Sequence, residues 1–298
     1  MGKGGSPSKA ILVSGTVLRR RSNRHLLRRL RHNRVAMIGL LIITIMTLIA
    51  VFGPSIAPHD PDTQFRGHRL ESPNQIFLLG TDNLGRDLLS RLLHGGRLSI
   101  GMAALATIAI AIIAVAVGCL AGYVGGLVDD LAMRVADVLL AFPGLVLALA
   151  IIGILGPGLV NVIFSVAVVA WAGYARLVRG LVFEVREKPF IEAAQAIGAS
   201  RARIMLRHII PNVISPVIVV VSLEMGGLIL TIASLNFLGL GVQPPTAEWG
   251  AMLNQGRLFF QSEPQLMICP GVMISLTVLG FNLVGDGLRD VLDPRYIQ

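Results

Sequence analysis

The 298-residue sequence has few charges, because only 14% of its residues are Asp, Glu, Lys or Arg. A soluble domain of this size carries roughly a quarter. Hydrophobic residues make up 54% of the chain, and its mean hydropathy is +0.72. This composition excludes an ordinary soluble protein and predicts several helices of about 20 apolar residues, each long enough to cross a bilayer. We therefore expect an all-α membrane protein.

Motifs for catalysis and for ATP binding are also missing. The sequence has no G-x-x-x-x-G-K-[ST] phosphate loop, no H-E-x-x-H, no C-x-x-C and no G-x-S-x-G. The six histidines are scattered, and His59 and His68 could be metal ligands if the external loop folded suitably. Cys119 and Cys269 lie in apolar stretches, which favours buried thiols over a disulfide. We expect no enzyme activity, no resident metal and no cofactor.

The start of the chain lacks acidic residues altogether. Residues 1–34 contain ten Lys or Arg and no Asp or Glu. Next to a membrane span, such a segment more often faces anionic lipid in the cytoplasm than it binds nucleic acid. The apolar run that follows is too long for a cleaved signal peptide. We therefore predict a basic cytoplasmic arm that contacts membrane lipid.

Hydropathy divides the rest of the chain into six predicted spans. They cover residues 35–52, 98–124, 131–155 with a kink at Pro143, 159–178, 213–242 and 266–284. A polar external loop, residues 53–97, separates the first span from a five-helix core at 98–298. Six spans place both termini on one side, and the positive-inside rule makes that side cytoplasmic, since residues 176–207 carry seven bases and three acids.

A polar segment at 184–212 separates the fourth span from the fifth. Apolar residues recur at near-helical spacing over 190–197, and Gly198 interrupts them. A second short helix is expected over 204–209, stopped by Pro211. Two short helices joined at a glycine form a compact knob, which suits docking of a partner better than it suits chemistry.

Two groups of charges fall inside apolar stretches. Asp130, Arg134 and Asp137 are spaced i, i+4, i+7 on one helix face, which predicts an ion-paired cluster or, alternatively, a role in transport. Glu224 lies about eleven residues into the fifth span, without a base within one turn. Its carboxylate either lines a water-filled path or joins helices by a hydrogen bond, with Asn236 or Asn282 as partner.

The polar segment also carries a family motif. Glu192-Ala193-Ala194, Gly198 four residues later, and Ile210-Pro211 resemble the EAA loop of ABC-importer permease subunits, in which EAA, three residues, Gly and nine residues precede I-x-L-P. This chain departs from that pattern at His208, which replaces the closing Ile, and at Ile210, which replaces the Leu.

Three more segments resemble the second, C-type permease of dipeptide, oligopeptide and nickel importers. They are LLGTDNLGRDLLSRLLHGGRLSI at 78–100, SLNFLGLGVQPPTAEWGAML at 234–253 and FNLVGDGLRDVLDPR at 281–295. The similarity covers nearly everything after about residue 31.

The resemblance implies a type I importer fold in the bacterial inner membrane. It implies a second homologous permease, two ATP-binding subunits that hydrolyse ATP, and an extracytoplasmic substrate-binding protein as partners. This chain would then form half of the translocation path. The EAA loop would be a coupling helix seated on an ATPase, with Ala193 and Ala194 allowing close approach and Gly198 giving the turn. The coupling residues implied are Glu192, Ala193, Ala194, Gly198, His208 and Pro211.

Cargo and energy source stay open at this level. Small peptides and nickel, free or chelated, fit the resemblance about equally. Glu224, Asp137 and Asn236 are the candidates for lining the path. The alternative function is an ion-coupled secondary transporter that uses Asp137 and Glu224 as relay carboxylates and needs no ATPase.

Overall fold

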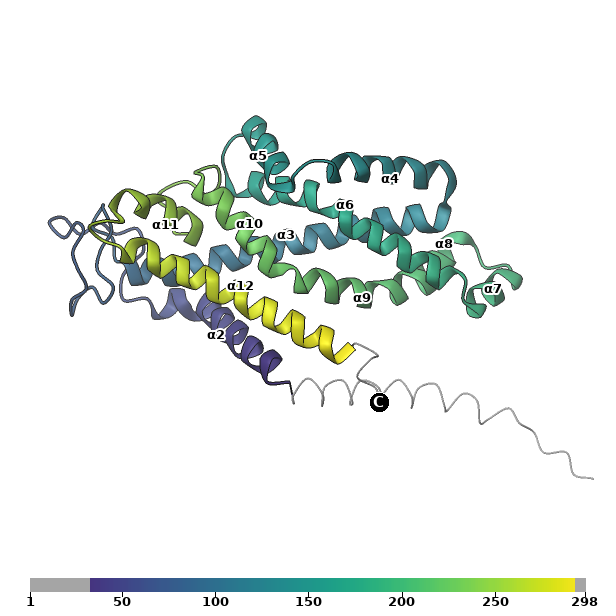
Figure 1. The fold of residues 1–298 in the computed structure, drawn as a ribbon, viewed down its shortest axis with the longest axis horizontal. Helices are drawn as coiled ribbons and strands as arrows, with labels where there is room; N and C mark the ends of the chain where they lie inside the picture. Colours follow the sequence, from purple (N-terminus) through teal and green to yellow (C-terminus); the bar gives the residue numbers. More distant parts are fainter. Residues whose placement is uncertain (1–32, 293–298) are drawn as a thin grey trace, which may run out of the picture.

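The computed structural model describes residues 33–292, so most of the basic arm and the last six residues lie outside the described part. Within that range the regular structure is helical (Figure 1). The helices are α2 (Arg34–Ile56), α3 (Leu88–Val124), α4 (Gly126–Leu140), α5 (Gly144–Leu155), α6 (Leu159–Arg186), α7 (Pro189–Ala196), α8 (Arg201–Ile204), η1 (Met205–Ile209), α9 (Ile210–Leu223), α10 (Met225–Phe237), α11 (Trp249–Gly256), η2 (Arg257–Phe259) and α12 (Gln265–Leu292).

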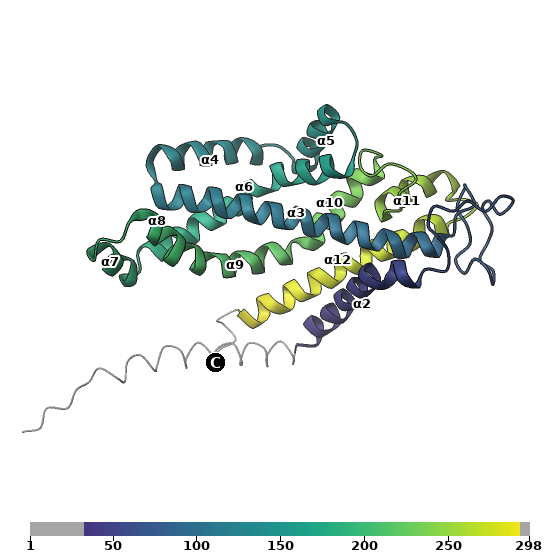
Figure 2. The same ribbon diagram turned by 180° about the vertical axis from the view of Figure 1, so that it is seen from behind.

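The helices form an elongated bundle with two different ends. The loop after α2 lies with α11 at one end, and α7 and α8 lie at the other (Figures 1 and 2). The start of α2 and the end of α12 both lie on the side away from that loop. Among the described residues, five helices are long and apolar enough to span a bilayer, and α4 with α5 make a sixth if the bent pair is one span. The predicted all-α membrane fold is confirmed.

Helix α3 is longer than the predicted second span. Its 37 residues rise about 56 Å, more than the roughly 30 Å of hydrocarbon in a bilayer. It begins at Leu88 and not near residue 98, because the Asp87 carboxylate caps its N-terminus by accepting the Ser90 N–H at 3.0 Å. The last ten residues of the predicted external loop are therefore helical.

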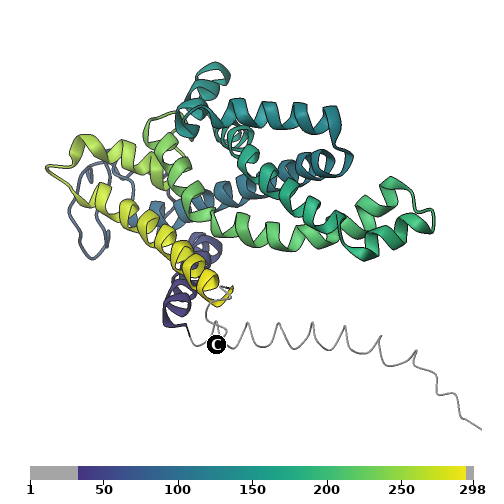
Figure 3. The same ribbon diagram turned by 45° about the vertical axis from the view of Figure 1, so that its right-hand side comes forward.

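Small residues let the central helices pack closely. A Cβ atom on Gly118 of α3 would lie 2.6 Å from the carbonyl oxygen of Ala175 on α6. A Cβ atom on Gly39 of α2 would lie 2.7 Å from Cβ of Leu283 on α12. Such close approach is typical of helix pairs within membranes. Figure 3 shows α2 and α12 on one side of the bundle and α4 and α5 on the opposite side.

Two predicted spans are interrupted. The third is two helices, α4 and α5, bent by 94° where Pro143 precedes α5, so the break is much sharper than the expected kink. The fifth, expected at 213–242, is divided at Glu224 into α9 and α10 and ends at Phe237. In both spans the apolar residues continue through the point where the helix changes direction. Hydropathy depends on composition alone, so it does not show such a break.

Buried charges hold the external end together. We call residues 57–87 together with 243–248 the external cap, after the side of the membrane predicted for this loop. The Arg86 guanidinium is 1% exposed, and its Nε lies 2.7 Å from the Asp82 carboxylate. Arg86 also donates to the Gln255 side chain at 3.0 Å, and Arg91 donates to the Pro245 carbonyl at 3.1 Å. These bonds tie the start of α3 to the segment that leads into α11.

A second buried acid caps α11. Glu248 is 0% exposed, and its carboxylate accepts the Ser99 hydroxyl at 2.7 Å and the Ala251 N–H at 2.8 Å. Burial raises the pKa of Glu248 above its ordinary value, and these hydrogen bonds oppose that rise. The adjacent Trp249 side chain is also buried and donates its indole N–H to the Leu92 carbonyl at 2.9 Å.

The described residues contain two apolar clusters. One lies toward the external cap and includes Trp249, Ile110 and Ile232. The other lies toward α7 and includes Val182 and Ile191. The cysteines are free and divided between the clusters, with Cys119 buried in the second and Cys269 packed beside the first.

Candidate functional site

The polar segment 184–212 forms a knob at the end of the bundle opposite the external cap (Figure 1). Helix α6 ends at Arg186, and the Lys188 ammonium pairs with the Glu184 carboxylate across this end at 3.0 Å. Pro189 then occupies the first turn of α7, where its fixed φ suits a helix start and its missing N–H is not needed. The predicted first helix of the knob is confirmed.

Gly198 closes α7 with a Schellman turn. Its φ of +78° lies in the left-handed region, which glycine adopts without strain. The Gly198 N–H donates to the Gln195 carbonyl at 2.9 Å, and the Ala199 N–H donates to the Ala194 carbonyl at 3.0 Å. These two bonds satisfy the last carbonyls of α7 and aim the chain into α8, which Ser200 caps.

One face of the knob packs on the bundle. Ile191 and Ile204 are 0% and 1% exposed and belong to the same cluster as Val182 of α6 and Val213 of α9. Ala194 is 7% exposed and lies in this face. Its small side chain therefore fits the chain's own core, which corrects the expectation that it allows a partner to approach.

The rest of the knob surface is open. Glu192 and Ala193 are exposed on α7. Ile197 is 85% exposed and Leu206 is 68% exposed, although both are large apolar residues, and Ile197 lies outside the candidate membrane spans. We call these four residues the open face. Exposed apolar side chains ringed by polar residues mark surfaces that bind other proteins.

Pro211 does not stop the second helix of the knob, so that prediction was wrong. The chain continues as one helix from Arg201 to Leu223. The π-helical turn η1 accommodates the proline: the Ile210 N–H donates to the Met205 carbonyl, five residues back, and Pro211 sits in the first turn of α9. His208 is half-buried in this turn, with its ring 6.2 Å from that of Phe190.

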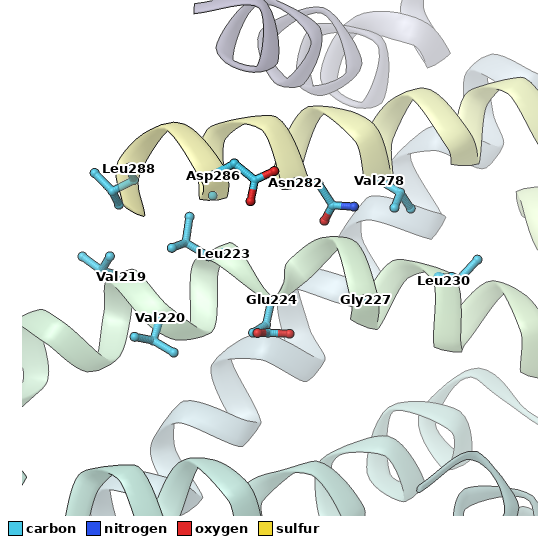
Figure 4. A pocket seen from close by; sticks show the side chains of 11 residues that line it. Val219, Val220, Leu223, Glu224, Gly227, Leu230, Val278, Asn282, Asp286 and Leu288 are labelled. Atoms are coloured by element: carbon cyan, nitrogen blue, oxygen red, sulfur yellow. The ribbon is translucent and has the colours of Figure 1, made fainter. Parts of the chain in front are cut away.

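Glu224 lies at the break between α9 and α10, beside a groove of about 830 Å³ (Figure 4). Side chains of α9, α10 and α12 line this groove. Asn282 and Asp286 point from α12 toward the α9–α10 chain. Glu224, Asn282 and Asp286 are all exposed in the single chain. The groove therefore carries two carboxylates and an amide.

The cluster expected at Asp130, Arg134 and Asp137 is replaced by pairs between helices. Asp137 of α4 pairs with Arg176 of α6. About two turns earlier on α4, Asp129 accepts two bonds from Arg179, each 2.5 Å long. Asp129 carries no local sequence signal, because its partner lies fifty residues away and only the packing of α4 on α6 brings the two together.

Asn236, the third path candidate, serves the backbone of its own chain. It is 1% exposed, accepts the Val242 N–H at 2.7 Å and donates to the Ile232 carbonyl at 3.0 Å. Both ends of its amide shape the turn after α10. This arrangement gives Asn236 a structural role, and its side chain does not line the groove beside Glu224.

Comparison with known proteins places the chain in a family. Residues 114–298 match the family described as binding-protein-dependent transport system inner membrane component. Residues 24–73 match the N-terminal transmembrane domain of oligopeptide transport permease C. The chain belongs to this permease family.

Relatives along nearly the whole length agree. The dipeptide transport system permease protein DppC of Alkalihalophilus pseudofirmus is 43% identical over 91% of this chain and 90% of its own. The di/tripeptide transport system permease protein DppC of Pseudomonas aeruginosa is 44% identical over 89% of each. The glutathione transport system permease protein GsiD of Pectobacterium atrosepticum is 42% identical over 96% of this chain and 97% of its own.

Membership fixes the general function. The permease is a multi-pass inner-membrane subunit of a binding-protein-dependent ABC importer, and ATP hydrolysis resides in partner subunits. An importer of this class works as a complex with ATPases, a partner permease and a binding protein. The alternative of an ion-coupled secondary transporter is not what this family indicates.

In this permease, two of the segments that carried the resemblance meet in space. Residues 78–100 supply Arg86 and Arg91, and residues 234–253 supply the Pro245 carbonyl that both arginines contact at 3.3 and 3.1 Å. Both arginines lie in the stretch predicted from the sequence as a polar external loop, residues 53–97. Their burial depends on a partner more than 150 residues away, for which the local sequence has no signal.

Proposed function

We propose that this permease forms half of the path for small peptides, either di- and tripeptides or glutathione, and that residues 184–212 couple it to an ATPase subunit. The cargo follows from the three relatives, which are named for dipeptides, di/tripeptides and glutathione. None of these names supports nickel, the other cargo that the sequence left open.

The knob supports the coupling role because it is tied firmly to the bundle and open on its other side. Its buried face shares a core with α6 and α9, so a displacement of the open face moves these helices with it. Glu192, Ala193 and Gly198 are exposed and available for contact, whereas Ala194 holds α7 in place. His208 and Pro211 belong to the turn that joins the knob to α9.

A continuous helix then carries the displacement to the groove. Residues 201–223 run without interruption from the knob to the break at Glu224. Beyond the break, α10 packs on α11 and α12 at the external half. A tilt of α9 on ATP binding therefore opens or closes the groove between α9, α10 and α12. ATP binding shifts the equilibrium between the open and the closed groove only through the contact between the ATPase and the knob.

The cargo is tested with the complete importer in proteoliposomes. ATP is enclosed in the vesicles, and the loaded binding protein is in the solution outside them. We expect ATP-dependent uptake of a labelled dipeptide, and competition from unlabelled di- or tripeptides or glutathione. The matched control omits ATP, and a second control imposes a proton gradient on the permease alone. Preferential uptake of Ni²⁺, or peptide accumulation by the permease alone, would contradict the proposal.

A further inference from the structure

The groove beside Glu224 continues toward the external end. A second hollow of about 440 Å³ lies between α10, α11 and α12, and Leu230 lines both hollows. Together they follow α10 and α12 from the cytoplasmic half of the bundle to Leu253 of α11. We call the two hollows together the track. Within the described chain, α9, α10, α11 and α12 line the track, and its other side is open.

The lining of this track changes along its length. Near the knob it holds Glu224, Asn282 and Asp286. Toward the external end it is mainly apolar, with Phe237, Leu253 and other large residues beside two serines. On α12, Ser275, Asn282 and Asp286 are spaced i, i+7, i+11, so they share the face that the track follows. One end of the track is acidic and the other suits apolar groups.

Glu224 is placed to face the open track. Among the described residues it forms no ion pair, and no hydrogen bond joins it to Asn236 or Asn282, the two partners expected for a helix-joining role. Gly227, one turn on, leaves it uncovered: a Cβ there would lie 3.8 Å from a Glu224 carboxylate oxygen. An ionised carboxylate facing lipid at this depth is costly, whereas one facing water or a cation is not.

We propose that this track is a cation-favouring section of the translocation path, in which Glu224 and Asp286 are counter-charges for the ammonium group of a passing peptide. The apolar end then receives the peptide's side chains. Among the side chains that the structure describes, no Lys, Arg or His lines either hollow, so the carboxylates set the sign of the local field there. This inference rests on the proposed function, because a peptide cargo supplies the ammonium group.

Charged thiol reagents measure this field directly. The probe is Asn282→Cys in the complete importer, with Cys119 and Cys269 changed to Ala. A cationic methanethiosulfonate should modify this cysteine about tenfold faster than an anionic one, since a lined cleft concentrates ions of opposite charge. Adding Glu224→Gln and Asp286→Asn should bring the two rates together. Glu224→Asp, which keeps the charge, should restore the preference.

A second probe controls for reagent chemistry. Ser275→Cys lies in the apolar part of the track, two turns from Asn282, and should show a smaller preference for the cation. Equal rates at Asn282→Cys, a preference that survives removal of both carboxylates, or no reaction with either reagent would overturn the inference.

Peptide uptake separates this inference from the proposed function. In proteoliposomes, Glu224→Gln should lower uptake of lysyl-alanine, which carries two ammonium groups, several-fold more than uptake of alanyl-glutamate, which carries one ammonium group and an added carboxylate, each relative to the unmodified importer. Taking each peptide relative to the unmodified importer removes the selectivity of the binding protein. Equal loss for both peptides contradicts the inference and leaves the importer function standing. If the unmodified importer takes up neither peptide, the proposed function fails and the ammonium assignment fails with it.

Discussion

Replacing Gly198 tests whether the knob transmits force. The residue has φ of +78°, and nothing lies within 4 Å of a Cβ built there. A side chain at this position therefore meets no neighbour, and its whole cost is the left-handed backbone. That cost is about 1 kcal/mol for Ala and about 2 kcal/mol for the β-branched Val. At about 1.4 kcal/mol per tenfold, the native turn becomes roughly 5-fold and 30-fold less favoured.

The effect should appear in coupling and not in assembly. The core that inserts in the membrane does not include this turn, so Gly198→Val should reach the membrane and associate with its partners at normal levels. We expect peptide transported per ATP hydrolysed to fall in the order Gly, Asn, Ala, Val, because Asn tolerates the left-handed region better than Ala. The assay is paired measurement of uptake and ATPase activity in proteoliposomes, stimulated by loaded binding protein.

The matched control is Gly180→Ala on α6. This glycine also has nothing within 4 Å of a built Cβ, but it lies inside a helix, where Ala is favoured over Gly by about 1 kcal/mol. It should leave coupling unchanged. If Gly198→Val transports as much peptide per ATP as the unmodified importer does, the turn plays no mechanical part and the coupling argument is wrong.

Three further predictions concern stability. Asp82→Asn should destabilise the external cap by about 3 kcal/mol, since buried Arg86 loses its carboxylate and buried Arg91 keeps only that of Asp62. Thermal unfolding should show this loss, whereas exposed Asp130→Asn should show none. Gly118→Leu should prevent folding of α3 against α6, whereas Gly101→Leu, which meets open space, should fold, as judged by protease resistance in membranes. Protonated Glu248 stabilises the fold fully below its unfolded pKa of about 4.3, and this stability is lost as the pH rises through its raised folded pKa. The free energy of unfolding, measured at several pH values, should therefore fall as the pH rises. Glu248→Gln should lack this loss.

Hydropathy predicted where most spans lie but not where they break. The stretches at 35–52, 159–178 and 266–284 each fall inside one helix, because about 20 apolar residues have few alternatives in a bilayer. The breaks at Pro143 and Glu224 were read as a kink and as a residue within a span. Where a helix changes direction, other helices must cover the backbone groups that are freed. No local sequence pattern indicates whether those helices are present.

The candidate site divides in the same way. Gly198 was recognised from its place after an amphipathic helix, and the structure shows the turn that this predicts. Asp137 was recognised as a charge needing a partner, but its partner Arg176 was not the one expected. Asn236 was assigned to the path, although its amide completes a turn that only the three-dimensional course of the chain creates.

The sequence by itself determined the membrane, the helical class and the turn at Gly198. These depend on composition and on bonds between near neighbours, which the order of residues specifies directly. Only the tertiary structure decided that Ala194 faces inward, that Arg86 and Arg91 are buried and that Glu224 opens on a groove with Asp286. Each of these features depends on which helices, distant in the sequence, pack together. A side chain is buried or paired only once that packing has formed.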